Sequence, residues 1–121
     1  MERTLVFLVR HGEVENPARI RYGRLPGFHL SAAGLGQVAR TVEHLATRAS
    51  DVAAVVTSPL ERAVETAGII AAQFGRPLES DPRVIEAASH FEGLPLDAPS
   101  LPRHWSELRN PFRRRWDRST R

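Results

Sequence analysis

The 121-residue chain contains no cysteine, which excludes disulfide bonds and any metal or redox site built on thiolates. It also lacks a long apolar run. The five consecutive apolar residues 5–9 are too few for the core of a signal peptide and far too few to span a membrane. We therefore expect no membrane segment and a cytoplasmic location.

Lysine is absent as well, so all seventeen basic residues are arginines, and the net charge of +3 is unevenly distributed. Residues 103–121 hold seven arginines and two acidic residues, a net charge of +5, which leaves −2 for residues 1–102. Residues 109–121 lack hydrophobic periodicity, and we interpret them as a basic, disordered tail beside a domain over residues 1–108. A nucleic acid is not the expected partner, because the body of the chain is net acidic.

Short apolar runs predict the strands. Residues 5–9 and 52–56 end at turn residues, which is typical of buried strands in the middle of a parallel sheet. Two further short strands are expected at residues 76–79 and 83–85. Because these strands alternate with helical patterns, we expect an α/β fold with a parallel sheet.

Two helices are predicted from apolar residues at helical spacing. The first covers residues 32–48, with Ser31 as its N-cap. The second covers residues 59–74, with Ser58 as N-cap, a glutamate three residues later, and Gly75 as its stop.

Candidate site residues stand at the ends of these elements. Arg10 and His11 follow residues 5–9, at the carboxyl end of a strand, where α/β folds bind ligands. Arginine suits a phosphate group, and a neutral imidazole can be a nucleophile or a base. Arg62 lies in the first turn of the second helix, and Glu86 is either an ion-pair partner of the arginines or a general acid. The loop 13–29 holds three arginines that face either an anionic substrate or solvent.

Four segments, in order, resemble the motifs of one family. Residues 10–13, with Asn16 close behind, resemble the first motif of the histidine phosphatase superfamily, the phosphoglycerate-mutase-like proteins. The later motifs resemble Gly23 with residues 30–37, residues 57–67, and Glu86 with residues 91–93. The resemblance covers most of the chain up to residue 94 and implies a three-layer α/β/α sandwich with a mostly parallel sheet.

The resemblance also implies roles. His11 would be the nucleophile that forms a phosphohistidine, and Glu86 would give a proton to the leaving group. No metal or other cofactor is expected, because arginines supply the positive charge. The residues that would bind the substrate phosphate or line its entrance are Arg10, Arg62, Asn16 and Gly23.

The chain departs from the family in one respect. The family has a second essential histidine, late in the chain and after an apolar strand, whereas His104 follows no such strand. We therefore expect a fold that is incomplete at its carboxyl end, as in a truncated gene product. The expected function is hydrolysis of a phosphorylated small molecule, impaired by this loss. The alternatives are a non-catalytic phosphate-binding module and mutase-type phosphoryl transfer, and a homodimer is compatible with either.

Overall fold

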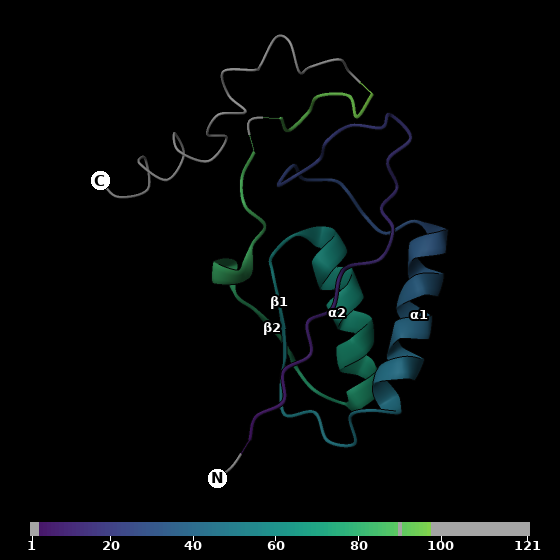
Figure 1. The fold of residues 1–121 in the computed structure, drawn as a ribbon, viewed down its shortest axis with the longest axis vertical. Coiled ribbons are helices and arrows are strands. Elements are labelled where there is room, and N and C mark those ends of the chain that lie inside the picture. Colours follow the sequence, from purple (N-terminus) through teal and green to yellow (C-terminus); the bar gives the residue numbers. More distant parts are fainter. Residues whose placement is uncertain (1–2, 90, 98–121) are drawn as a thin grey trace, which may run out of the picture.

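The computed structural model describes residues 3–89 and 91–97, and within them helices alternate with the strands of a parallel sheet (Figure 1). The parallel sheet predicted from the sequence is confirmed, since β1 and β2 pair in parallel with Val55 opposite Leu78. The elements, in order, are α1 (Ala32–Ala46), β1 (Val55–Thr57), α2 (Glu61–Phe74), β2 (Leu78–Ser80) and a 3-10 helix (Pro82–Val84).

Helix α1 begins as predicted. The Ser31 side chain accepts a hydrogen bond from the Gly34 N–H at 3.0 Å, and the helix ends two residues before the predicted boundary. Glycine at position 34 also permits a close backbone approach, because a Cβ there would lie 2.1 Å from the Glu13 carbonyl oxygen. The segment that carries His11 therefore packs directly on the first turn of α1.

Helix α2 begins later than predicted, and the prediction that Ser58 is its N-cap was wrong. The helix starts at Glu61, with Leu60 in the N-cap position and no side-chain cap. The Glu61 carboxylate accepts from the Gly27 N–H at 3.0 Å, so a residue in the first turn of α2 also holds a distant loop. Gly75 ends the helix as predicted, in the left-handed conformation with φ of 60°.

The core lies where α2 meets both α1 and the sheet (Figure 1). Apolar spacing in each helix places one face against this interface. The buried side chains of the core are Val38, Val42, Leu45, Val55, Ala67, Ile70 and Ala71. The core therefore fixes α2, which carries Arg62 at its amino-terminal end.

Residues 5–9 do not form the buried strand that we predicted. Leu8 is 95% exposed and Leu5 is 74% exposed. A strand needs a backbone neighbour for its hydrogen bonds, and no described strand pairs with this segment. Residues 5–9 instead line a cavity of about 1320 Å³ together with β1 and α2. The apolar sequence of residues 5–9 predicted a buried strand, but no described strand lies beside them to pair with.

The strand predicted at residues 83–85 was also wrong. The chain there forms the 3-10 helix Pro82–Val84, capped by the Asp81 side chain, which accepts from the Arg83 N–H at 2.9 Å. Proline lacks the N–H that a strand ladder requires, which favours the turn. The strands predicted at residues 52–56 and 76–79 are present as β1 and β2, each shifted toward the carboxyl end.

Several predictions lie outside the described residues, namely the boundary at residue 108, the basic tail and His104. Within the described part of the chain, none of the helices has the length and apolarity needed to cross a membrane.

Candidate active site

His11 is half-buried and fixed by backbone contacts. Its Nδ1 lies 2.7 Å from the Gly12 carbonyl oxygen, which can only accept, so Nδ1 carries the proton and Nε2 is left as the nitrogen that can accept a hydrogen bond. The Gly12 N–H donates to Thr66 Oγ1 at 3.2 Å, and that hydroxyl donates to the Arg62 carbonyl at 2.8 Å. Helix α2 therefore holds the backbone next to His11.

Arg62 is the centre of the site, with 1% of the residue exposed. Its Nε donates to His11 Nε2 at 3.3 Å, and its Nη2 donates to the Gly23 carbonyl at 2.6 Å and to Glu86 Oε2 at 2.8 Å. Its Nη1 is buried and has no hydrogen-bond partner among the described residues. A buried charged donor without an acceptor is costly, so Nη1 stands out as a donor whose partner the described residues do not supply.

Glu86 is the carboxylate of this cluster, and its side chain is 53% exposed. The ion pair with Arg62 that the sequence left open is present. The Glu86 backbone carbonyl accepts a hydrogen bond from Arg24 Nε, which ties the segment after the 3-10 helix to the loop 13–29. The carboxylate is therefore held at the site while one side of it stays open to solvent.

Gly23 lies in a turn that only a small residue fits. Its φ is +42°, and a Cβ there would lie 2.4 Å from Glu92 Cγ. Glu92 Oε1 accepts from the Arg24 N–H at 3.1 Å and from the Ser89 N–H at 3.3 Å. Glu92 therefore joins the turn that meets Arg62 to the segment that carries Glu86.

Aromatic side chains complete the surroundings of Arg62. The guanidinium carbon lies 4.6 Å from the centroid of the Tyr22 ring, and Phe28 stacks on Tyr22 with centroids 5.1 Å apart. The Tyr22 ring also lies edge-on to His11, at 6.5 Å. The sequence analysis missed Tyr22, and the signal available was its place directly before Gly23.

The structure places two other predicted residues outside the hydrogen-bonded cluster. Arg10 is exposed and lines the same large cavity as His11, Arg62 and Glu86, without a hydrogen bond to a described residue. The Asn16 amide is engaged with the Ile20 backbone, since Nδ2 donates to the carbonyl at 2.9 Å and Oδ1 accepts from the N–H at 3.1 Å. Their roles toward a substrate stay predictions.

The three loop arginines turn toward the chain itself. Arg19 Nη2 pairs with Asp97 at 3.1 Å, and Arg21 Nη2 donates to the Leu96 carbonyl at 3.4 Å. The backbones pair too, because the Arg21 N–H donates to the Leu94 carbonyl at 2.8 Å. These contacts join the loop 13–29 to the segment after Glu86, while the three arginines stay exposed, as the solvent-facing alternative expected.

Glu65, on α2, makes long-range contacts that the sequence did not predict. It accepts from the Leu30 N–H at 2.7 Å and is hydrogen-bonded to His29 Nδ1. The hydrogen bond to Glu65 raises the pKa of His29. Burial alone would raise the pKa of Glu65, but the Leu30 and His29 hydrogen bonds outweigh it and lower that pKa. Helix α2 thereby holds the loop that carries Phe28.

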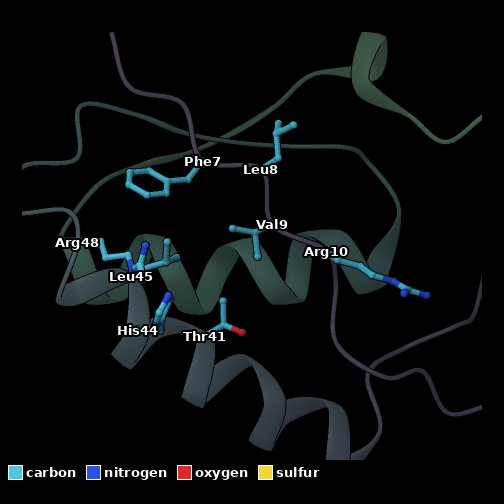
Figure 2. Close-up of a pocket in the computed structure, with 8 residues that line it drawn as sticks. All are labelled: Phe7, Leu8, Val9, Arg10, Thr41, His44, Leu45 and Arg48. Carbon is cyan, nitrogen blue, oxygen red and sulfur yellow. The ribbon is translucent and has the colours of Figure 1, made fainter. Parts of the chain in front are cut away.

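A second pocket, of about 370 Å³, lies between residues 7–10 and the second half of α1 (Figure 2). Arg10 extends away from His44 and Arg48 in this view, so the three basic side chains do not converge on one ligand. Within residues 3–89 and 91–97, no group of three or more histidine, aspartate or glutamate side chains is placed to hold a metal ion.

Comparisons with known proteins identify the family of this chain. The family model of the histidine phosphatase superfamily (branch 1) matches residues 6–120, a span that includes most of the predicted tail. The uncharacterized protein Rv0525 of Mycobacterium tuberculosis is 54% identical over 119 residues, covering 95% of this chain and 58% of that protein. The bifunctional protein Rv2228c of the same species is 33% identical over 108 residues, covering 84% of this chain and 29% of that protein.

Solved structures give the same result. Mycobacterial glucosyl-3-phosphoglycerate phosphatase Rv2419c in complex with VO3 superposes with a TM-score of 0.65 at 28% identity, over 80% of this chain and 50% of that one. Its complex with inorganic phosphate gives a TM-score of 0.62 at 28% identity, over 80% and 46%. This chain thus spans little more than half the length of the first relative and about half that of the solved structures.

Proposed function

Because the chain belongs to the histidine phosphatase superfamily (branch 1), we propose that it hydrolyses small phosphomonoesters through a phosphohistidine on His11. The observation that carries this proposal is the buried Arg62, whose Nε meets His11 Nε2 while its Nη1 lacks an acceptor among the described residues. A phosphoryl oxygen beside His11 supplies that acceptor. The VO3 and phosphate complexes of the similar mycobacterial phosphatase support an oxyanion as the ligand.

In the first step, the lone pair of His11 Nε2 forms a bond to phosphorus while the bond from phosphorus to the ester oxygen breaks. The Nδ1–H bond to Gly12 keeps the ring in the tautomer that this attack requires. Arg62 stabilises the charge on the phosphoryl oxygens, and Arg10, on the wall of the same cavity, adds a second positive charge. When the phosphoryl oxygens replace Glu86 as the partner of Arg62, the carboxylate takes up a proton from solvent on its open side and gives it to the leaving alkoxide.

In the second step, water attacks phosphorus, the bond from phosphorus to His11 Nε2 breaks, and inorganic phosphate leaves. Glu86, now ionised, takes the proton of the attacking water. Its half-exposed side chain, 2.8 Å from Arg62 Nη2, is open to both the leaving alcohol and the incoming water. The relative that acts on glucosyl-3-phosphoglycerate makes a phosphorylated sugar acid a reasonable second substrate to assay.

The test is hydrolysis of an aryl phosphate by the wild-type chain, His11→Ala and His44→Ala. Loss of the nucleophile lowers the rate by at least about 1000-fold. His44 is the matched control, because it is an exposed histidine on α1 outside the cluster, and its replacement leaves the rate unchanged. Mass spectrometry of the quenched reaction should find an acid-labile phosphoryl group on His11. Equal rates for wild type and His11→Ala reject the proposal.

One observation favours a second candidate, a phosphate-binding module without turnover. Among the histidines that the structure describes, only His11 contacts Arg62, since His29 is bonded to Glu65 and His44 lies in the pocket beside α1. A site with one histidine can bind phosphate without completing the reaction. Thermal stabilisation by inorganic phosphate, lost in Arg62→Gln and unaccompanied by hydrolysis in the wild type, would single out this function.

A further inference from the structure

The contacts of the Arg62 guanidinium leave one of its motions unrestrained by hydrogen bonds. Acceptors at Nε and Nη2 lie along the N–H directions, so they resist movement within the plane of the group. The bond to His11 is long, at 3.3 Å, and Nη1 has no partner within the described residues. Tilting out of the plane must be resisted by what lies against the flat face.

The Tyr22 ring packs against the guanidinium. The guanidinium carbon is 4.6 Å from the ring centroid, within the range of a cation–π contact, and the arginine is 1% exposed. Phe28 stacks on the same ring, and the loop that carries Phe28 is held to α2 through Glu65 and Glu61. Helix α2 therefore also supports the Tyr22 ring, through the loop that carries Phe28.

We propose that Tyr22 is a positioning residue for Arg62, which keeps the guanidinium in the plane where Nε faces His11 and Nη1 faces the ligand. This inference rests on the proposed function for its catalytic consequence, but the position of the guanidinium can be measured without catalysis. The hydroxyl of Tyr22 is not needed for this role, whereas the ring is.

The experiment compares Tyr22→Phe, Tyr22→Leu and Phe28→Leu with the wild-type chain. Tyr22→Leu weakens binding of inorganic phosphate about tenfold, whereas Tyr22→Phe keeps it within about twofold. Phe28→Leu is the matched control, because it removes an aromatic ring that touches Tyr22, and it weakens phosphate by less than about threefold. With an aryl phosphate as substrate, kcat/KM follows the same order.

A magnetic-resonance measurement in the wild-type chain does not depend on any variant folding. The Arg62 Nε–H proton should be shifted upfield by the ring current of Tyr22 and show a cross-peak to its ring protons. Tyr22→Phe keeps both signals, and Tyr22→Leu loses them. Absence of the cross-peak in the wild type, or equal losses of phosphate affinity in Tyr22→Leu and Phe28→Leu, would overturn the inference. Intact signals without phosphate binding or hydrolysis would uphold it and reject the proposed function.

Discussion

The cluster around Arg62 and the apolar segment 5–9 meet at one cavity but differ sharply in burial. Arg62, a charged residue, is 1% exposed and hydrogen-bonded to three different segments, whereas Leu8, an apolar residue, is 95% exposed. Both line the same large cavity. Burial in this molecule thus follows the availability of partners rather than the polarity of the side chain.

The difference has a physical cause. Arg62 finds acceptors because α2 is anchored in the core and the loops carrying Gly23 and Glu86 are bonded to each other. Residues 5–9 have no strand beside them among the described residues, so their apolar side chains stay in contact with water. The cluster around Arg62 is therefore the end of the cavity with more buried and hydrogen-bonded side chains.

Replacing Arg62 should have the largest effect on both hydrolysis and stability. Arg62→Gln removes the donor to the Gly23 carbonyl and the ion pair with Glu86, and we expect aryl phosphate hydrolysis to fall at least about 100-fold. Loss of the buried hydrogen bonds should lower the free energy of unfolding by about 1–3 kcal/mol. Arg83→Gln should change neither, because Arg83 lies at the surface and its partner among the described residues is Asp81. Urea unfolding and the rate assay check both values.

Two alanine substitutions compare how much a core side chain and an exposed side chain contribute to the free energy of unfolding. Val38 is 2% exposed, so Val38→Ala should lower the free energy of unfolding by about 1–2 kcal/mol. Leu8→Ala removes a larger side chain but one that is already in water, so we expect no measurable loss. Denaturant unfolding of the two variants decides, and a Leu8→Ala cost as large as that of Val38→Ala would show that residues 5–9 are buried in solution.

The link between His11 and α2 should have a smaller effect. Thr66→Val keeps the shape of the side chain and removes the acceptor for the Gly12 N–H, which should cost about 1 kcal/mol. Hydrolysis should fall with it, because the backbone beside the nucleophile is less firmly held. Thr66→Ser restores the hydroxyl and should restore both quantities, and a serine variant as impaired as the valine variant would contradict this role.

The smallest expected effect is a dependence of stability on pH through His29. Its pKa is raised by Glu65, so its stabilising contribution is fully present below the unfolded value of about 6.5 and is lost as pH rises through the raised value. The melting temperature of wild type minus that of His29→Gln should therefore be larger at acidic pH and shrink at alkaline pH. A difference that is independent of pH would show that this hydrogen bond does not stabilise the fold.

Much of the site was predictable because its residues occur in ordered motifs. His11, Arg62, Gly23 and Glu86 were all identified from the sequence, and the structure brings them together. The supporting residues Tyr22, Thr66 and Glu92 were not, because each acts on a residue far along the chain through a contact that no local pattern encodes.

The start of α1 and the end of α2 could be predicted from the sequence, because each depends on one residue acting locally. The Ser31 hydroxyl reaches an N–H three residues away, and Gly75 adopts a left-handed turn at no steric cost. The exposure of residues 5–9 and the bond between Glu61 and Gly27 depended on the tertiary structure. Those outcomes depend on partners that are distant in sequence. The hydrogen bonds of Arg62 do too, since His11, Gly23 and Glu86 are separated from it by 51, 39 and 24 positions.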